Sequence, residues 1–243
     1  MNETGVRLSV VATVLNEAEN VRPVLTELAA ALQPLRPFEV IFVDDGSTDT
    51  TRAELLACRA LLPELRVLGH DRRCGKSAAL RTGVEAARGT WIATLDGDGQ
   101  DDPAEIAALL ALAEGANGAS PLVVGVRVTR HDRLSRRLAT RIANGLRQRL
   151  LADGCPDTAA PMKLFAREAF LRLPQFEGLH RFLPALLGSY GHPLLCRPVV
   201  HRRRLHGTSK YTNLERALVG VRDMAGVMWL QKRTVRPGQV TEV

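Results

Sequence analysis

The sequence predicts an α/β fold with a mainly parallel β-sheet flanked by helices. Short apolar runs alternate with amphipathic segments over the first half of the chain. This alternation is typical of parallel strands joined by helices. Several of the apolar runs end in polar, mostly acidic residues, and the ligands of such sheets bind beyond the carboxyl ends of the strands. The pattern therefore predicts both the fold class and the place of a binding site.

The expected elements follow one another in order. Strands are expected where Val, Ile and Leu are concentrated between polar residues, over residues 7–15, 38–43, 65–68, 91–95 and 122–126. Helices are expected over residues 20–32, 50–61, 76–87 and 103–113. A chain of 243 residues with 45% hydrophobic residues can bury the core of one domain, and no long linker divides it.

Composition argues against several classes of protein. The four cysteines include no C-x-x-C pair, which argues against a zinc site or a disulfide framework and favours a reducing cytoplasm. No apolar leader follows Met1, and no run of about 18 apolar residues occurs, so we expect neither secretion by that route nor a membrane span. The net charge of +7 and the pI near 9.8 predict an anionic partner: nucleic acid, a phosphorylated substrate or an acidic membrane.

The clearest candidate site follows the fourth expected strand. Asp96 and Asp98 are one residue apart, and Gln100 adds a neutral oxygen. Hard divalent ions such as Mg²⁺ and Mn²⁺ prefer oxygen ligands and keep positions open for substrate phosphates. An ordinary acidic turn has the same composition. However, Asn16-Glu17 and Asp44-Asp45-Gly46-Ser47 follow two earlier strands, and together these loops predict one site at one edge of the sheet.

The three motifs together resemble those of the GT-A glycosyltransferases of family 2. In that family the first two motifs bind the nucleotide of a nucleotide sugar, and the D-x-D carboxylates hold a divalent ion on its diphosphate. The resemblance implies that Asp98 is a catalytic residue through the ion, which stabilises the leaving diphosphate. The implied nucleotide-binding residues are Asn16, Glu17, Asp44, Asp45, Ser47, Lys76 and Asp96. The implied ligands of Mg²⁺ or Mn²⁺ are Asp96, Asp98 and Gln100.

A rival motif lies between the acidic loops. Residues 69–77 follow a strand and open a helix, as a P-loop does, but five residues instead of four separate Gly69 from Gly75. An NTPase is therefore the weaker interpretation. The same segment resembles the R-x-x-G-K loop of the polyprenyl-phosphate branch of family 2, which implies that Lys76 approaches the diphosphate. A solvated lysine at a helix start is the alternative.

Arginines are concentrated after the fifth expected strand. Apolar residues recur with helical spacing over residues 134–146, which predicts a helix with an apolar stripe and a basic remainder. Such a helix either packs on the sheet with solvated arginines or faces a membrane. In the dolichol- and polyprenyl-phosphate sugar synthases, a strand-end arginine and the following basic segment bind the lipid phosphate. The resemblance implies this role for Arg127, which is also a candidate catalytic residue, and for Arg136 or Arg137.

Later segments extend the resemblance to these synthases over nearly the whole chain. Residues 156–168 match them at Asp157 and Lys163, although Ala160-Pro161 depart from the usual turn. Residues 177–182 resemble the segment that precedes the sugar-side helix. Residues 202–211 resemble the R-x-x-G-x-S-K-Y signature, which implies that Ser209 and Lys210 bind the acceptor phosphate.

We therefore expect a GT-A domain over residues 1–212, with a nucleotide-sugar half (1–115) and an acceptor half (116–212). The expected reaction is inverting transfer of a sugar from a UDP- or GDP-sugar to a polyprenyl phosphate. Because that acceptor is already an anion, no general base is required, and His180, His201 and His206 are not assigned as bases. The sugar stays open among glucose, mannose, galacturonate and aminoarabinose.

Three other functions would each explain part of the sequence. A family 2 enzyme with a carbohydrate acceptor would share the donor motifs but would need a carboxylate base. A nucleic-acid-binding module would explain the charge, but the chain has few aromatic residues for stacking and no such motif, so we expect no nucleic-acid partner. An inactive scaffold would be expected to lose the metal carboxylates, which are present.

The C-terminal segment over residues 213–243 is expected to be an amphipathic helix and a tail. Residues 225–230 are apolar nearly all round, and Trp229 is followed by Gln231-Lys232-Arg233, a combination suited to a membrane surface. We expect peripheral attachment to the cytoplasmic face of the cell membrane, where attraction to anionic lipids weakens as salt rises. A helix that closes the core or forms a homo-oligomer contact is the alternative.

Overall fold

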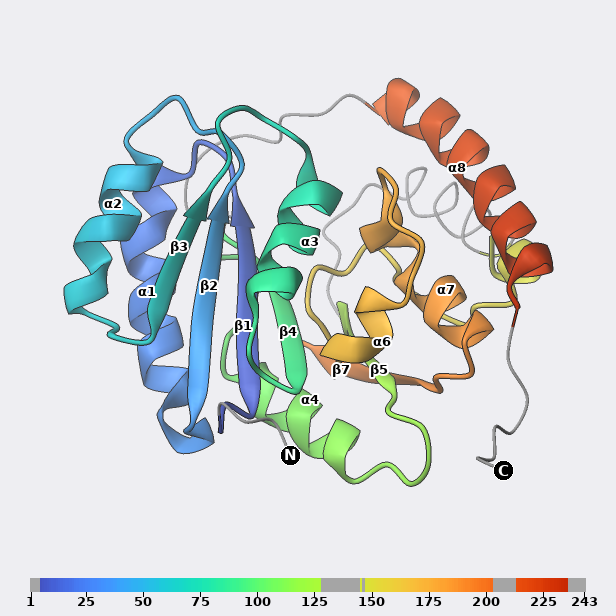
Figure 1. Ribbon diagram of the computed structural model, residues 1–243, viewed down its shortest axis with the longest axis horizontal. Coiled ribbons are helices and arrows are strands. Elements are labelled where there is room, and N and C mark those ends of the chain that lie inside the picture. The colour runs from blue at the N-terminus through green and yellow to red at the C-terminus, as the bar shows by residue number, and fades with distance from the viewer. Residues whose placement is uncertain (1–4, 128–144, 146, 203–212, 236–243) are drawn as a thin grey trace, which may run out of the picture.

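The computed structural model describes residues 5–127, 145, 147–202 and 213–235, with side chains in the last segment from residue 220. Within these residues seven strands form one sheet in the order β3-β2-β1-β4-β6-β5-β7. Strand β6 is antiparallel to both of its neighbours, and the other neighbouring pairs are parallel. The mainly parallel sheet with flanking helices that the sequence predicts is confirmed (Figure 1).

The elements alternate along the first half of the chain and become less regular after β5. The strands are β1 (Leu8–Val14), β2 (Phe38–Asp44), β3 (Leu65–Gly69), β4 (Trp91–Asp96), β5 (Leu122–Arg127), β6 (Lys163–Ala166) and β7 (Leu194–Val199). The helices are α1 (Ala18–Leu32), α2 (Thr51–Ala57), α3 (Lys76–Ala86), α4 (Glu105–Glu114), α6 (Arg167–Leu171), α7 (Leu183–Ser189) and α8 (Asn213–Arg233). Short 3₁₀ turns are η1 (Gln33–Leu35), η2 (Cys58–Ala60) and η3 (Leu179–Arg181).

The apolar runs become strands because their side chains are buried on both faces of the sheet. Along β1, Val10 and Ala12 face one layer of the core, and Val11 faces the other. The first layer lies under α1, α2 and α4, and the second lies under α3, α6 and α7. This two-sided burial explains why the strands are continuous apolar runs instead of alternating ones.

The strand register brings the polar loops to one edge. Asp44 at the end of β2 pairs with Val14 of β1 and with Gly69 of β3, and Asp96 at the end of β4 pairs with Thr13. Arg127 ends β5, which runs parallel to β7 and antiparallel to β6. Because β6 is reversed, its first residue also lies at this edge. The sheet therefore gathers loops that are far apart in sequence.

The helix expected over residues 50–61 is shorter in the structure. Helix α2 ends at Ala57, and the chain continues as η2. Pro63 disfavours the helical conformation of the preceding residue, and the side chain of that residue, Leu62, is buried in the core. The first helix begins at Ala18, two residues before the expected start.

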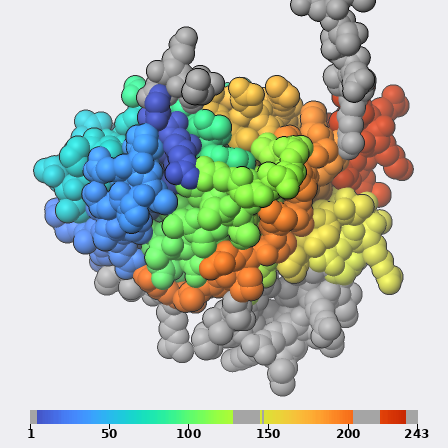
Figure 2. Space-filling view, turned by 90° about the horizontal axis from the view of Figure 1, so that it is seen from below, coloured from blue at the N-terminus to red at the C-terminus, as the bar shows by residue number. Residues whose placement is uncertain are grey.

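Over residues 220–233, helix α8 contacts other described parts of the protein through buried and half-buried side chains. Val227 is fully buried, Arg181 forms an ion pair with Asp223 (2.7 Å), and Gln231 Nε2 donates to the carbonyl oxygens of Leu151 (3.0 Å) and Ala185 (3.3 Å). In Figures 1 and 2, α8 (red) lies at the opposite end of the molecule from α2 (cyan). None of the described helices has both the length and the apolar composition needed to cross a membrane.

Candidate functional site

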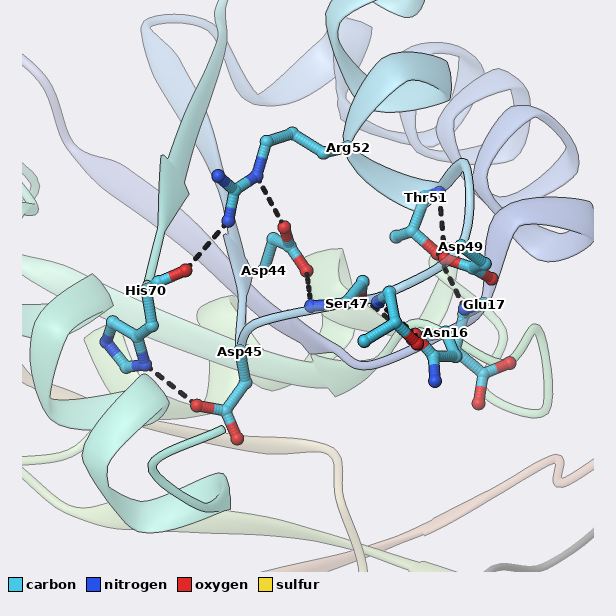
Figure 3. A network of polar contacts seen from close by, with 10 residues as sticks. Asn16, Glu17, Asp44, Asp45, Ser47, Asp49, Thr51, Arg52 and His70 are labelled. Carbon is cyan, nitrogen blue, oxygen red and sulfur yellow. Dashed lines mark hydrogen bonds and ion pairs between the residues drawn. The ribbon is translucent and has the colours of Figure 1, made fainter. Parts of the chain in front are cut away.

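Hydrogen bonds tie together the loops that follow β1 and β2 (Figure 3). The Asn16 N–H donates to Ser47 Oγ (2.9 Å), and the Thr48 N–H donates to Asn16 Oδ1 (2.8 Å). Asn16 has a φ of 51°, in the left-handed region that asparagine tolerates better than most residues. The Glu17 N–H donates to Thr51 Oγ1 (2.8 Å). Two sequence motifs therefore form one continuous surface.

The Asp44 carboxylate holds the loop that follows β2 in place. Its side chain is fully buried. Oδ1 accepts from the Ser47 N–H (3.0 Å), and Oδ2 accepts from Arg52 Nε (2.7 Å). Arg52, in the first turn of α2, also donates through Nη2 to the His70 carbonyl oxygen (2.8 Å), as Figure 3 shows. The Asp44–Arg52 pair thus links the ends of β2 and β3.

Asp45 holds the loop that follows β3. Its Oδ1 contacts His70 Nδ1 (2.7 Å) and accepts from the Cys74 N–H (2.8 Å), and its Oδ2 accepts from the Gly75 N–H (2.8 Å). A nucleotide that used the Asp44 or Asp45 carboxylate would share it with these donors. The expectation that one of them contacts the base or ribose stays a prediction.

The same loop contains a group of three potential metal ligands. Among the described residues, Asp45, His70 and Cys74 form a group of three side chains whose potential ligand atoms lie close enough together to bind one metal ion. The Asp45–His70 contact accounts for this grouping without a metal. Gly46 has a φ of 74°, and a Cβ there would lie 2.4 Å from the Arg72 carbonyl carbon, so a glycine is needed for the two loops to approach.

The acidic loop after β4 has an all-oxygen donor set that fits a hard divalent ion. Asp96 forms an ion pair with Lys76, the first residue of α3. Asp98 is 5% exposed, and its Oδ1 accepts from the Gln100 N–H (3.1 Å). A lysine ammonium therefore already lies against one of the expected metal ligands. The residues present fit Mg²⁺ or Mn²⁺ in charge and ligand chemistry.

The acidic loop is also bound to the segment that follows β7. The Arg202 N–H donates to the Gln100 carbonyl oxygen (2.8 Å), and Gln100 Nε2 donates to the Arg202 carbonyl oxygen (3.2 Å). Asp101 pairs with His201 in an antiparallel bridge, and its Oδ2 accepts from the Asp96 N–H (3.1 Å). Arg202, the first residue of the basic segment, therefore lies beside the acidic loop.

Arg127 is held by a carboxylate that lies 30 residues further along the chain. Its Nε and Nη2 donate to the two oxygens of Asp157 at 2.7 and 2.8 Å. The side chains are 19% and 4% exposed. Burial lowers the pKa of Arg127, but the Asp157 carboxylate outweighs burial and raises this pKa above its ordinary value. The bidentate contact fixes the guanidinium at the end of β5.

Sequence comparison identifies the family to which these loops belong. The family model described as glycosyl transferase family 2 matches residues 9–173. The chain belongs to glycosyl transferase family 2. It is 33% identical over 241 residues to a dodecaprenyl-phosphate galacturonate synthase from Rhizobium johnstonii, covering 96% of this chain and 70% of the relative. It is 36% identical over 213 residues to an undecaprenyl-phosphate 4-deoxy-4-formamido-L-arabinose transferase from Pectobacterium carotovorum, covering 86% of this chain and 63% of that relative.

Solved structures confirm the GT-A type of fold for this family 2 protein. Glucosyl-3-phosphoglycerate synthase from Mycobacterium tuberculosis with Mg²⁺ and uridine diphosphate matches with a TM-score of 0.69 at 19% identity, over 97% of this chain and 83% of that one. A mannosyltransferase from Pyrobaculum calidifontis with GDP-mannose and Mn²⁺ matches with a TM-score of 0.64 at 21% identity, over 97% and 66%.

The structure brings most of the expected site residues of the glycosyltransferase to one edge of its sheet. The residues expected on the donor side, together with Arg127, lie in the loops at the carboxyl ends of β1, β2, β4 and β5 or at the start of α3. Four residues expected to bind the acceptor phosphate lie outside the described residues: Arg136, Arg137, Ser209 and Lys210. The amphipathic helix expected over residues 134–146 falls almost entirely outside them as well.

Three contributors to this edge were not assigned a role from the sequence. Arg52 closes the Asp44 loop, and its position in the first turn of a helix directly after an acidic loop is a signal that could have identified it. His180 contacts Ser77 of α3, which lies 103 residues earlier in the sequence, and no local sequence pattern predicts this contact. Lys163 matches the resemblance, but its burial is visible only in the structure.

Proposed function

We propose that this family 2 glycosyltransferase transfers a sugar from a nucleotide sugar to a polyprenyl phosphate, with inversion at the anomeric carbon. The observation that carries the proposal is that the acidic loop of β4 and the Arg127–Asp157 pair lie at the same edge of one sheet. Donor and acceptor groups could thus meet there. The relatives at 33% and 36% identity are named as polyprenyl-phosphate sugar transferases, which supports this acceptor class.

On the donor side, the loops of β1 and β2 would bind the nucleoside, and Lys76 would contact the diphosphate. Asp96, Asp98 and Gln100 would hold Mg²⁺ or Mn²⁺, and the ion would supply positive charge next to the diphosphate leaving group. The Asn16–Ser47 contacts keep these loops fixed before substrate binds, so the protein reorganises little on binding.

On the acceptor side, Arg127 would contact the phosphate of the lipid. Asp157 orients the guanidinium through Nε and Nη2, and Nη1 is not part of this bidentate contact. Arg136 or Arg137, Ser209 and Lys210 would complete this phosphate site. Because a phosphate monoester is the nucleophile, the reaction needs alignment and charge stabilisation more than it needs a base.

We also propose that α8 rests on the cytoplasmic face of the membrane. Its outward side carries Val221, which is 62% exposed, and Trp229, which is 61% exposed. Arg222 and Lys232 are exposed on the same helix. A tryptophan with neighbouring basic residues suits the boundary between lipid headgroups and acyl chains. The catalytic edge would then stay close to its lipid substrate.

Nucleotide binding tests the donor half of the proposal. UDP or GDP together with Mn²⁺ should raise the melting temperature of the wild-type protein, because a ligand that binds only the folded state stabilises it by mass action. Asp98→Ala should abolish the metal-dependent part of this rise. Glu168→Gln, which removes an exposed charge on α6, is the matched control. An equal rise in EDTA or in Asp98→Ala would contradict the assignment of the metal loop.

Liposome sedimentation tests the membrane contact. Val221→Asp with Trp229→Asp should release the protein from anionic vesicles, whereas Leu112→Asp, on an exposed apolar residue of α4, should not. Equal binding of the two variants would remove α8 as the anchor. If the double variant of α8 still binds vesicles but no longer self-associates, the exposed face of α8 is a homo-oligomer contact.

A further inference from the structure

A buried amine lies beside the proposed metal loop without a carboxylate partner. Lys163 is the first residue of β6 and is 4% exposed. Its Nζ donates to the carbonyl oxygen of Ala160. No Asp or Glu oxygen of the described residues is within ion-pair distance of it. Burial, followed by the positive charge of Lys76, lowers the pKa of Lys163 to about 8, so the amine is still mostly protonated at pH 7.

This amine lines a small pocket whose other lining residues come from the sheet, α3, η3, α7 and the loop before β6. Leu80 of α3 and Leu183 of α7 form apolar walls, and Pro161 belongs to the loop before β6. The cavity measures about 30 Å³. A water needs roughly 10–15 Å³ of such space, so the pocket admits a substituent of a sugar but not the ring itself.

The polar groups of the pocket have a net positive charge. Lys76 and Asp96 both line it, but they neutralise each other in an ion pair. Lys163 forms no ion pair with a carboxylate of the described residues, although the nearby Asp157 and Asp96 carboxylates partly offset the lowering of its pKa by burial. Buried charges are costly unless they are paired. A ligand that brought one negative group into this space would therefore gain a strong charge-assisted contact.

His180 adds an imidazole ring to the pocket. The Gly178 N–H donates to Ser77 Oγ (3.0 Å), and Ser77 Oγ forms a hydrogen bond with His180 Nδ1 (2.8 Å). His180 lines the same pocket as Lys163. An ammonium and an imidazole ring are both groups that can form hydrogen bonds with carboxylate oxygens.

We propose that this pocket binds the carboxylate of a uronic acid carried by the nucleotide sugar, so that Lys163 selects acidic donor sugars over neutral ones. The inference rests on the proposed function, which places the diphosphate at Asp96 and therefore the sugar next to the pocket. The named sugars of the two relatives, galacturonate and 4-deoxy-4-formamido-L-arabinose, differ in charge. The charge of the pocket favours the acidic class.

Matched donors that differ only at C6 test the inference. The probes are UDP, UDP-galactose and UDP-galacturonate with Mn²⁺, measured by calorimetry. If UDP does not bind, GDP, GDP-mannose and GDP-mannuronate replace them. The wild-type protein should bind the uronate about tenfold to a hundredfold more tightly than the neutral sugar, which is the effect of one charge-assisted contact. Equal affinity, or preference for the neutral sugar, would overturn the proposal without any variant.

Lys163→Met then assigns the effect to the residue. Methionine has a similar volume and carries no charge to bury, so the variant should stay folded. It should bind the uronate and the neutral sugar within about twofold of each other, with unchanged affinity for UDP. Arg59→Met, which removes an exposed charge from η2, should keep the preference. An unchanged preference in Lys163→Met would overturn the assignment.

Lys163→Met also distinguishes between two anionic groups that Lys163 could bind, the carboxylate of the sugar and the β-phosphate of the nucleotide. If Lys163 binds the β-phosphate of the nucleotide, Lys163→Met weakens UDP and both sugars equally, and the sugar-carboxylate proposal is wrong. If neither nucleotide binds the wild-type protein, the proposed function itself fails.

Discussion

Replacing Arg127 by alanine should have two separable effects, one on stability and one on the acceptor. Removing one partner of a buried ion pair leaves the other charge unpaired and costs roughly 3–5 kcal/mol. Arg127 and Asp157 are 19% and 4% exposed, so we expect about 3 kcal/mol in the free energy of unfolding. For a chain of this length that corresponds to a melting temperature lower by about 6–12 °C. Differential scanning fluorimetry measures it.

The kinetic effect of Arg127→Ala should fall on the acceptor alone. Loss of a charge-assisted hydrogen bond to the lipid phosphate should lower the acceptor kcat/KM by about one to two decades. The donor KM should not change. Arg66→Ala is the matched control, since it breaks the ion pair with Glu39 (2.5 Å) at the opposite edge of the sheet. If both variants are destabilised and neither changes the acceptor kcat/KM, Arg127 is structural and the phosphate binds elsewhere.

Further predictions concern the metal loop, the buried lysine and the C-terminal helix. Transfer should be lost in EDTA and in Asp98→Ala, with an unchanged circular dichroism spectrum showing that the fold persists. The folded protein holds Lys163 at a pKa of about 8, below the ordinary 10.5, so between these pH values the unfolded chain binds more protons and stability rises with pH. Relative to Lys163→Met, the wild-type protein should therefore gain about 3 kcal/mol from pH 8 to 10.5, measured by urea unfolding. In a Trp91→Phe background, Trp229 fluorescence should shift to the blue on anionic vesicles, less so in high salt; no shift would contradict the contact.

The strands could be predicted because buried strands consist mainly of apolar residues. The expected ranges of β1 to β5 agree with the structure within one residue at each end. Two-sided burial makes β1, β2, β4 and β5 mainly apolar runs, and the polar loops mark where they stop. In contrast, β7 was not predicted. It contains Arg197 and Pro198, which argue against a strand, but β7 lies at the edge of the sheet, where proline is tolerated.

The site could be predicted only as far as its local motifs extend. The D-x-D loop and the loops after β1 and β2 are contiguous in sequence, and their place at a strand end follows from the fold class. The partners of these groups are not contiguous. Arg127 meets Asp157 because β6 reverses direction between β4 and β5, and the chain returns to the same edge. The sequence motif suggested Arg127 as a phosphate ligand but gave no sign of the carboxylate that orients it.

The cysteines show the same limit. Their spacing argued against a shared site, and all four are free thiols. The fold nevertheless brings Cys155 into hydrogen-bond contact with Cys196 of β7. Burial raises the pKa of Cys155 to about 12, so its thiol is unreactive at neutral pH. Proximity in the fold does not make this pair a reactive site.

The transfer reaction itself tests the central claim most directly. Purified protein, Mn²⁺ and undecaprenyl phosphate would be incubated with radiolabelled UDP-galacturonate, UDP-galactose, UDP-glucose or GDP-mannose, and the lipid extracted into butanol. The account predicts an acid-labile labelled lipid from at least one donor, formed with release of the nucleoside diphosphate and absent with Asp98→Ala. Label that stays in the aqueous phase with every donor, or a lipid product formed equally by Asp98→Ala, would contradict it.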